Sequence, residues 1–393
     1  MRQEPSAAPL AGLRAVVSAS GVAAAYAGRL LSVLGAETTL VEPPGGSPLR
    51  LEPPFLDAQG QASALFAYLA TGASSQVCDL ETEAGRKALG ALLDAADIFV
   101  DDTPLAQRQA RGLDQATIAK AHPQLVHVSV LPFGAIGPKA DWKAEEINAL
   151  HASGEGFLLP NGLTLELFPD RPPVKIYGNF SLMQGGIAAA LGALSAVWAR
   201  PQAGGQFVDI SVQDAGLAVG CFAVQRYGDG SVENRHIRSF KYGGVIECAD
   251  GFVELLTLEQ RQWTGLVELL GRPDWATDPA LADSLERSRQ GAAINARLRE
   301  WAKGQKVADV VSKGQALGVP LAKYAEPSDL LSNEHEKERG FFAPISVPGA
   351  GEVQSPTAPF RFRGAPLPLR GGPPALNEHD QARPASVPAG QGA

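Results

Sequence analysis

The stretch Leu13–Glu42, which reads LRAVVSASGVAAAYAGRLLSVLGAETTLVE, decides the fold. Its beginning, LRAVVSAS, and its end, AETTLVE, have the composition of β-strands. The segment between them, VAAAYAGRLLSVLG, has the apolar spacing of a helix and stops at Gly35, where a glycine commonly ends a helix. Strand, helix and strand in this order predict a βαβ unit with two parallel strands.

The same alternation continues along the chain. SSQVCDL from Ser74 and DIFVDD from Asp97 read as strands on either side of a helical segment, ETEAGRKALGALLDAA. A short helix near Leu113–Ala121 then leads to a further strand, QLVHVSVLP from Gln124. This pattern predicts an α/β domain with a doubly wound, Rossmann-like parallel sheet, whose sites lie in the loops at the strand ends.

After Asn179 the chain changes character twice. A long helix of small apolar residues, LMQGGIAAALGALSAVWA from Leu182, predicts a buried packing helix, and a strand, GGQFVDISV, follows it. From about Tyr227 a short strand pair precedes three amphipathic helices, which predicts a smaller α+β domain. The predicted organisation is a large domain over residues 1–200, a linker over 201–226, the small domain over 227–325, a return to the large domain over 326–375 and a disordered tail over 376–393.

Composition argues against several classes of function. The net charge of -8 and the pI near 5.4 are unlike those of proteins that bind nucleic acid or anionic membranes. The N-terminus has no apolar core of signal-peptide length, and no apolar run approaches the roughly 20 residues of a membrane helix, so we expect a cytoplasmic protein. The three cysteines fit neither a disulfide framework nor a zinc site, and the first strand-to-helix turn lacks the G-x-G-x-x-G of NAD-binding folds.

Several segments spread over residues 13 to 363 resemble one protein family. Together they are similar to the class III acyl-CoA transferases, the CaiB/BaiF family. The resemblance implies a Rossmann-like large domain, a smaller α+β domain and two chains threaded through each other as an interlocked dimer. The matching segments include YAGRLLSVLGAETTLVEPPGGSPLR from Tyr26, CDLETEAGRKAL from Cys78, FGAIGP from Phe133, GGQFVDISVQDA from Gly204 and GVPLAKYAEPSDLLSNEHEKERGFF from Gly318.

The resemblance also implies an activity. Members of the family move CoA between an acyl-CoA and a carboxylic acid, and some relatives racemise or epimerise 2-methylacyl-CoAs. An aspartate attacks the donor thioester to give an enzyme-bound anhydride and then an enzyme thioester, while nearby glycines stabilise the oxyanions. CoA or acyl-CoA would therefore be a substrate, with no metal and no permanently bound cofactor.

The nucleophilic aspartate of the family has no counterpart in this chain. It stands at the head of the small-residue helix, four residues before a glycine, and counting back from Gly186 puts Leu182 in its place. A shift of the alignment by one residue gives Ser181, and the segment GNFSLMQGG contains no acid. A leucine cannot form an anhydride, so no catalytic residue is predicted and the usual mechanism is expected to fail. The fallback carboxylate is Asp170, twelve residues upstream of Leu182.

Other departures affect the expected contacts with CoA. Where the family has a basic residue, an asparagine and an aromatic residue, this chain has Glu81, Asp102 and Thr103. Carboxylates within about 5 Å of the CoA phosphates repel them unless a cation pairs with the carboxylate. Lys143 falls where formyl-CoA transferases carry a lysine near CoA, and Arg111 lies one residue from another basic position of that group. Both cations are equally well explained as solvated surface residues.

Three functions are compatible with this pattern. In the first, the chain is the catalytically silent subunit of a hetero-oligomeric CoA-transferase and pairs with a related active chain. In the second, it is an active class III CoA transferase, or an isomerase similar to the 2-methylacyl-CoA racemases, whose carboxylate comes from elsewhere. In the third, it is a homodimeric, non-enzymatic protein that binds acyl groups or CoA.

Overall fold

The computed structural model describes residues 8–160, 168–220, 224, 227–228 and 242–378. These residues belong to two compact units. The first unit is built from Met1–Gly154, Ile176–Gly220 and Asn333–Ala393, and the second from Glu155–Lys175 and Cys221–Ser332.

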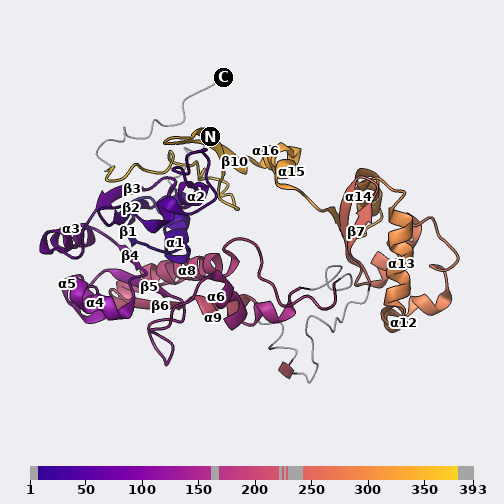
Figure 1. Ribbon diagram of the computed structural model, residues 1–393, viewed down its shortest axis with the longest axis horizontal. Helices are drawn as coiled ribbons and strands as arrows, with labels where there is room; N and C mark the ends of the chain where they lie inside the picture. The colour runs from indigo at the N-terminus through magenta and orange to yellow at the C-terminus, as the bar shows by residue number, and fades with distance from the viewer. Residues whose placement is uncertain (1–7, 161–167, 221–223, 225–226, 229–241, 379–393) are drawn as a thin grey trace. The chain divides into compact units, whose positions relative to one another are not determined.

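A parallel six-stranded sheet forms the centre of the first unit (Figure 1). Every neighbouring pair of strands is parallel, and the strand order is β3-β2-β1-β4-β5-β6. The chain reverses its direction of progress across the sheet between β1 and β4, as it does in Rossmann-like folds, which confirms the predicted α/β class. The strands are β1 Arg14–Ser18, β2 Glu37–Glu42, β3 Ser74–Val77, β4 Ile98–Asp101, β5 Val126–Leu131 and β6 Phe207–Ser211.

Helices cover both faces of this sheet because successive strand residues point in opposite directions. Val17 and Val100 pack with one set of helices, whereas Val16 and Phe99 pack with the other. The first set comprises α1 (Val22–Val33), α2 (Ala64–Ala70), α6 (Glu146–Ala152), α8 (Phe180–Ala203) and α9 (Val212–Val219). The second comprises α3 (Glu83–Asp94) and α5 (Gln115–Ala121), with the short α4 (Leu105–Arg111) preceding α5.

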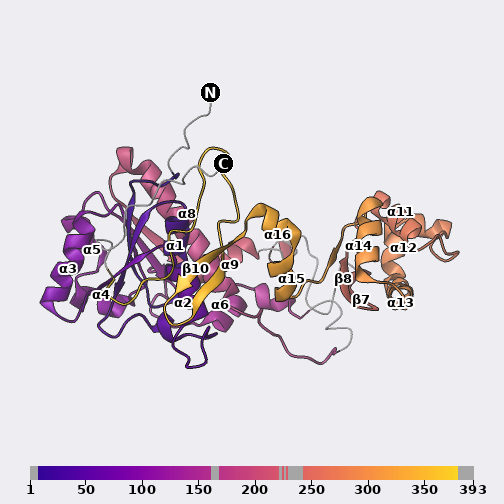
Figure 2. The same cartoon turned by 90° about the horizontal axis from the view of Figure 1, so that it is seen from above.

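The long helix α8 packs closely against α1, and both views show the two helices side by side (Figures 1 and 2). Gly186 permits this approach, since a Cβ atom at that position would lie 2.7 Å from the carbonyl oxygen of Ala23. On a neighbouring side of the helix, a Cβ at Gly185 would lie 2.8 Å from a methyl group of Val212. The small residues of α8 therefore set the distance between the helices of this layer.

The C-terminal segment returns to the first unit. After α16 (Glu334–Arg339), strands β10 (Phe342–Val347) and β11 (Gly351–Pro356) form an antiparallel hairpin that packs against α2. The buried guanidinium of Arg29 donates to the carbonyl oxygens of Tyr68 and Pro356, which ties α1 to the end of this hairpin.

Two segments differ from what their sequences suggested. Residues 201–226, predicted as a linker that begins with the strand GGQFVDISV, contain the end of α8, that strand as the edge strand β6, and helix α9. Residues 376–393, predicted as a disordered tail, include Asn377, whose side chain accepts a hydrogen bond from the Val77 N–H at 3.0 Å. Residues 379–393 lie outside the described residues.

The second unit is smaller and has its own core, in agreement with the predicted α+β domain. Its antiparallel sheet has the order β7-β8-β9. Trp263, Leu266 and Ile294 are among the buried residues that hold helices against this sheet. The elements are β7 Gly244–Cys248, β8 Gly251–Leu255, α11 Gln260–Leu269, α12 Ser284–Arg289, α13 Gly291–Ala302, α14 Val307–Ala316, β9 Leu321–Lys323 and α15 Pro327–Ser332.

Candidate functional site

The carboxyl edge of the parallel sheet is where ligands bind in folds of this class, above all where the strand order reverses. Helix α1 starts at this edge because it directly follows β1. Helix α8 also starts there, since it leads into β6 and must run antiparallel to the strands. The amino ends of α1 and α8 carry the partial positive charge of a helix start, and a carboxylate from elsewhere in the chain binds each of them.

The head of α8 is held by Glu146. One carboxylate oxygen of Glu146 accepts a hydrogen bond from the Ser181 N–H at 3.0 Å, and the other accepts from the Leu182 N–H at 3.0 Å. Glu146 is only 6% exposed, and Asn179, the residue before the helix, makes no capping bond with its own side chain. Glu146 thus satisfies two of the free N–H groups with which every helix begins.

Leu182, at the predicted nucleophile position, carries no reactive group. Its side chain is half-buried and packs against the core shared by α1, α8 and the sheet. The nearby carboxylate of Glu146 has both oxygens engaged by backbone N–H groups, so it acts as a helix cap. Sequence reasoning missed Glu146 because it lies 35 residues before Ser181, and capping patterns are recognised only between near neighbours.

Asp170, the fallback carboxylate, is exposed and belongs to the second unit, whereas Leu182 belongs to the first. Asp170 lies in a turn that precedes the segment leading to α8. Its role as a relocated nucleophile stays a prediction.

The head of α1 is held by Asp102, which directly follows β4. Its carboxylate accepts the Ser20 N–H at 2.9 Å and the Gly21 N–H at 2.7 Å. Burial raises the pKa of Asp102 to about 7. The hydrogen bonds from the Ser20 and Gly21 N–H groups lower this pKa, but their effect is smaller than that of burial. A carboxylate of this chain therefore binds the two N–H groups at the end of the turn that joins β1 to α1.

A buried polar cluster lies next to Asp102, along the neighbouring strands β4 and β5. Arg108 makes an ion pair with Asp101 at 3.2 Å and donates to the Ser129 hydroxyl at 2.9 Å. His127 lies 3.6 Å from Asp101 and between the rings of Phe99 and Phe207. The positive charge of Arg108 is thus paired with the carboxylate of Asp101 inside the protein.

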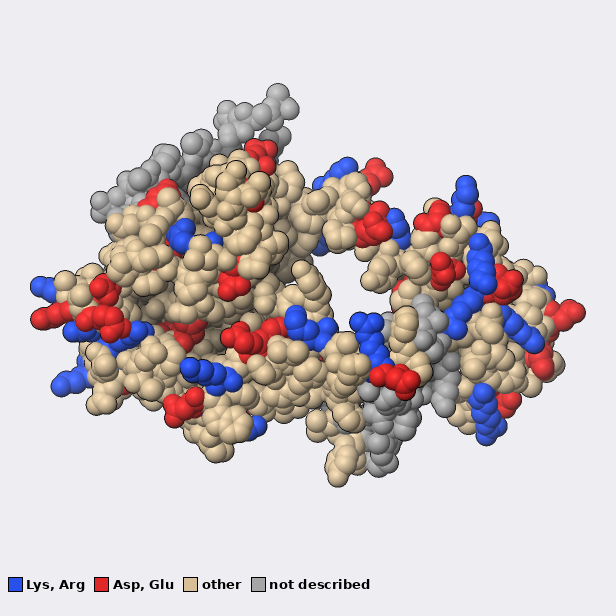
Figure 3. All heavy atoms as spheres, in the orientation of Figure 1, with Lys and Arg blue, Asp and Glu red and all other residues tan. Residues whose placement is uncertain are grey.

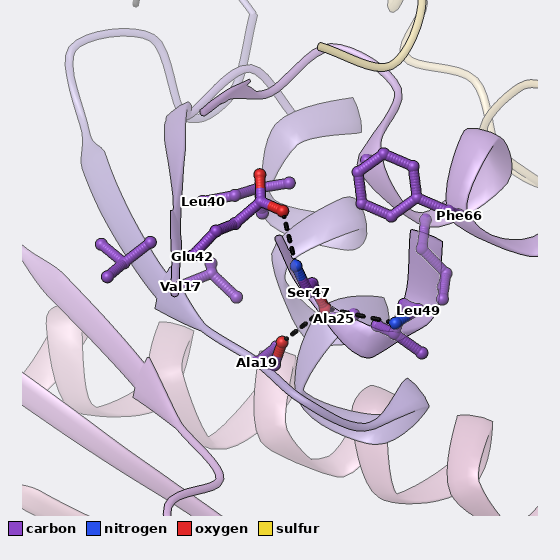
Figure 4. A pocket seen from close by; sticks show the side chains of 11 residues that line it. Val17, Ala19, Ala25, Leu40, Glu42, Ser47, Leu49 and Phe66 are labelled. Atoms are coloured by element: carbon purple, nitrogen blue, oxygen red, sulfur yellow. Dashed lines mark hydrogen bonds between the residues drawn. The ribbon is translucent and has the colours of Figure 1, made fainter. Parts of the chain in front are cut away.

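A small cavity of about 20 Å³ lies at the carboxyl end of β2, where Rossmann-like folds often place an acid that binds ribose (Figure 4). Glu42 points toward it but is fully engaged: Arg50 binds its two oxygens at 2.7 Å each, and Ser75 and the Ser47 N–H also donate to it. Burial raises the pKa of Glu42, but these hydrogen bonds outweigh burial and hold the pKa below its ordinary value. Glu42 is part of the scaffold.

The remaining residues predicted to contact CoA bind other parts of the protein or are exposed, and their contact with CoA stays a prediction. Arg111 pairs with Glu81 at 2.6 Å, so the unexpected acid neutralises the nearby cation. Thr103 is buried, and its carbonyl oxygen accepts a hydrogen bond from Arg108 at 2.8 Å. Lys143 is exposed in the loop before α6.

Within the described ranges, no group of three or more His, Cys, Asp and Glu side chains is placed to hold a metal ion. In the same part of the chain, one helix, α8, is long and apolar enough to cross a membrane. It packs against α1 and the sheet as a core helix of the first unit. On the face seen in Figure 3, Lys and Arg side chains are interspersed with Asp and Glu.

Comparison with known proteins gives one consistent result. A family model described as CoA-transferase family III matches residues 10–380. A protein of Mycobacterium tuberculosis named as a probable CoA-transferase is 31% identical over 379 residues, which cover 92% of this chain and 46% of that protein. This chain thus spans about half the length of that relative.

Two further relatives are matched over most of both chains. Subunit BbsE of the succinyl-CoA:(R)-benzylsuccinate CoA-transferase of Thauera aromatica is 27% identical over 93% of this chain and 91% of its own length. Among solved structures, a CaiB/BaiF family protein from Brucella suis is 28% identical and has a TM-score of 0.83, with 96% of this chain and 98% of that chain covered.

Proposed function

Because the chain belongs to CoA-transferase family III, we propose that it takes part in the transfer of CoA between an acyl-CoA and a carboxylic acid, as the non-catalytic subunit of a hetero-oligomer. The partner is a related chain that carries the aspartate this chain lacks. The same proposal places the complex in the cytoplasm.

The observation that carries the proposal is the side chain at the head of α8. Leu182 stands at the position of the nucleophile. The nearby carboxylate of Glu146 accepts hydrogen bonds with both oxygens from N–H groups of the same helix. The backbone at residue 182 is therefore well fixed, but no group there can attack a thioester. Removal of a covalent nucleophile from such a site commonly lowers the rate by several orders of magnitude.

In the proposed complex the chemistry takes place on the partner. The partner's aspartate attacks the carbonyl carbon of the donor acyl-CoA, CoA thiolate leaves and a mixed anhydride forms. The thiolate then attacks the aspartyl carbonyl carbon, which releases the donor acid and leaves an enzyme thioester. The acceptor carboxylate then attacks the enzyme thioester, which releases CoA thiolate and forms a second mixed anhydride. The thiolate attacks the acceptor's carbonyl carbon in this anhydride, which gives the new acyl-CoA and frees the aspartate.

The relatives support a subunit role. The Thauera aromatica protein is itself named as a subunit of a CoA-transferase, and it matches this chain along nearly its full length. The Mycobacterium tuberculosis relative is more than twice as long as the matched region. Both are compatible with a chain that works beside a second polypeptide segment.

The exposed side of α8 offers a surface for that partner. Phe180, Ile187, Leu191 and Trp198 are spaced by seven, four and seven residues, which puts them on one side of a helix. Leu191 is 66% exposed and Trp198 86% exposed in the described part of the chain. We call these four residues the α8 stripe. An aromatic and aliphatic stripe of this kind is typical of surfaces that bind another protein. A second copy of this chain in an interlocked homodimer is the alternative occupant.

Co-expression tests the proposal. The chain is purified alone, and together with a family III homologue from the same genome that has the aspartate, and CoA transfer is measured with succinyl-CoA or acetyl-CoA as donor. We expect no turnover by the chain alone and turnover by the hetero-oligomer. An Asp→Asn change at the partner's nucleophile should abolish it, while Asp170→Asn in this chain should leave it unchanged.

Two outcomes favour the alternatives. Turnover by this chain alone that Asp170→Asn removes would make it an active transferase or isomerase with a relocated carboxylate. A stable homodimer that binds CoA or a free acid but is inactive in every mixture would favour the non-enzymatic binding protein.

A further inference from the structure

The two edges of the parallel sheet differ in what covers them. β3 and β6 are the outermost strands and lie at opposite ends of the sheet (Figure 1). Along β3, the Ser75 N–H donates to the carbonyl oxygen of Glu378 at 2.8 Å. The Val77 N–H donates to the side chain of Asn377 at 3.0 Å, so the C-terminal segment covers this edge. Along β6, no strand of the described residues pairs on the side that faces away from β5.

The backbone groups on the open side of β6 belong to every second residue. The Gln206 carbonyl oxygen accepts the His127 N–H at 2.9 Å, and His127 is opposite Phe207 in the register of the two strands. In a parallel pair with this register, Val208, like Gln206, directs its backbone groups toward β5. Phe207 and Asp209 therefore direct theirs away from the sheet. An extended chain segment alongside could bind these groups as a further strand.

A hollow of about 370 Å³ adjoins the carboxyl end of β6. Asp209 and Ile210 both line it, together with Ala188 of α8 and Ile136 of the loop after β5. Because Asp209 and Ile210 are successive strand residues, their side chains point to opposite faces of the sheet. A hollow with walls from both faces lies at the outer edge and end of the strand, since β5 fills the inner side. We call this hollow the β6 groove.

The β6 groove is acidic. Two carboxylates, Asp209 and Asp214, line it, and among the described residues no Lys or Arg does. Asp209 accepts the Ala135 N–H at 2.7 Å, but no ion pair within the described residues offsets the charge of either carboxylate. Lys139 lies nearby, over the Phe133 ring and 5.5 Å from its centroid. A segment with an arginine or lysine side chain would therefore complement the groove.

The β6 strand of a second copy is a poor occupant of this edge. In the antiparallel register that pairs all five residues of β6 with those of another copy, Asp209 of one copy lies directly opposite Asp209 of the other. Like charges directly opposite each other on neighbouring strands destabilise the pairing. The charge of β6 thus favours a strand of different sequence.

We propose that β6 is a docking edge for the partner subunit: an extended segment of the partner that carries an arginine or lysine adds a seventh strand to the sheet and places its basic side chain in the β6 groove. This role of β6 rests on the proposed function, in which the partner is a related chain. It adds to the α8 stripe a second contact, made of main-chain hydrogen bonds to Phe207 and Asp209 and an ion pair in the groove.

Hydrogen–deuterium exchange at single-residue resolution tests the added strand, on the full chain alone and in the purified hetero-oligomer. In the chain alone, the amides of Phe207 and Asp209 should exchange faster than those of Val208 and Ile210, which bind β5. In the hetero-oligomer we expect exchange at Phe207 and Asp209 to slow at least about tenfold, with little change at Val208 and Ile210. This alternation distinguishes a new strand from a general stabilisation of the region.

Two variants test the charge of the β6 groove. Asp209→Asn can still accept the Ala135 N–H but has no charge, and Ile136→Arg places a cation where the partner's cation would lie. We expect each to weaken association with the partner about tenfold in analytical ultracentrifugation. Leu51→Arg is the matched control, because Leu51 is 73% exposed, Ile136 is 80% exposed, and Leu51 lies outside the groove. Its affinity for the partner should be that of the wild type. Circular dichroism confirms that each variant is folded.

Four results would overturn the inference. An active hetero-oligomer whose Phe207 and Asp209 amides exchange as in the chain alone would exclude β6 as the docking edge and leave the proposed function intact. Wild-type affinity of both Asp209→Asn and Ile136→Arg would exclude a basic side chain in the groove. Protection that appears in the chain alone and grows with its concentration would make a second copy the occupant. The absence of a hetero-oligomer with every related chain tested would overturn the docking edge and the proposed function together.

The opposite separation is also measurable. Slowed exchange at Phe207 and Asp209 in a hetero-oligomer that shows no turnover would support the docking edge and contradict the proposed function.

Discussion

At the scale of single residues, the head of α8 is held by a carboxylate from another helix and carries a leucine at residue 182. Glu146 accepts hydrogen bonds from the N–H groups of Ser181 and Leu182, the two positions at which the resemblance predicts the family's nucleophile. The side chain of Leu182 turns to the core instead. The backbone at residue 182 is thus held by Glu146 while the leucine side chain contributes to the core, so we expect this residue to support stability.

Substitution of Glu146 tests its capping role. Glu146→Gln keeps one oxygen acceptor but places an NH2 group against the second backbone N–H, which leaves that N–H without a partner. We expect the free energy of unfolding to fall by about 1–3 kcal/mol, measured by urea denaturation. Glu352→Gln, at an exposed position of β11, is the control and should change stability by less than about 0.5 kcal/mol. Equal stability of the two variants would contradict the capping role.

The pKa of Asp102 predicts a pH dependence of stability. Burial raises this pKa from 3.8 to about 7 in the folded protein, so between these values the folded state holds a proton that the unfolded state has released. Stability from this group is therefore present at low pH and is lost as the pH rises through about 7. Asp102→Asn lacks this ionisation, so its stability relative to the wild type should increase between pH 5 and pH 8.

Urea unfolding of both proteins at each pH measures this difference. Asp101 and Arg108 are the charged groups that act on the Asp102 carboxylate. Both are present in the wild type and in the variant, so the difference in stability between the two proteins reports on Asp102. A stability difference that does not vary with pH would contradict the raised pKa.

The sequence could identify which residue types stand at the site but not which of them meet. The resemblance predicts Leu182 and Asp102 as departures from the family, the first by counting back from Gly186 and the second from its place at the end of a predicted strand. The contact between Glu146 and the head of α8, and the pairing of Arg111 with Glu81, join residues 30 or more positions apart. Such contacts follow from tertiary packing, which local patterns do not encode.

At the scale of elements, the glycines of α8 decide how closely the helix packs on α1. Gly186 faces the backbone of Ala23 and the ring of Tyr26, and a carbonyl oxygen cannot move aside as a flexible side chain can. Gly90 in α3 gives the opposite case, since a Cβ atom built there has no neighbour within 4 Å. Glycine therefore allows close packing of α8 on α1 at residue 186, whereas at residue 90 it only lowers the stability of α3.

A pair of glycine substitutions measures this contrast. Gly186→Ala would force α1 and α8 apart, and we expect a loss of about 1–3 kcal/mol in unfolding free energy. Gly90→Ala should instead raise stability by about 0.5–1 kcal/mol, because alanine is the better helix former. Thermal and urea unfolding distinguish the two. A Gly186→Ala variant as stable as the wild type would show that the helices are less tightly packed than described.

The elements with strong periodicity were predicted well, whereas those that depend on partners were not. The βαβ alternation from Leu13 onward matches β1, α1 and β2. Strand β6 matches the predicted strand GGQFVDISV, but its place in the large-domain sheet beside β5 was not predicted, because local pattern does not say which strand it pairs with. Strand β11, GEVQSP, has few of the β-branched and aromatic residues from which a strand is predicted. It is a strand because it pairs with β10.

At the scale of the whole molecule, the α8 stripe is an apolar surface that the described residues leave exposed. Four large apolar side chains on one helix face cost free energy when they are exposed to water. Burial against another chain would recover it, and it would place that chain beside the head of α8.

A charge in the α8 stripe should weaken assembly. Leu191→Glu places a carboxylate in the middle of the stripe, and we expect association with the partner, or with a second copy, to weaken about tenfold or more. Leu285→Glu in α12 is the control, because Leu285 is 65% exposed and Leu191 is 66% exposed. Analytical ultracentrifugation of both variants measures the effect. Unchanged assembly of Leu191→Glu would exclude the stripe as the interface.

The central claim, that this family III chain has no working nucleophile, is tested most directly by intact-mass spectrometry. The chain alone is incubated with succinyl-CoA or acetyl-CoA, beside an active relative that has the aspartate, and each sample is divided and treated with hydroxylamine. The relative should show a CoA-dependent, hydroxylamine-sensitive adduct, and this chain should keep its unmodified mass. An adduct that maps to Asp170, or to any other carboxylate of this chain, would contradict the claim and identify an active enzyme.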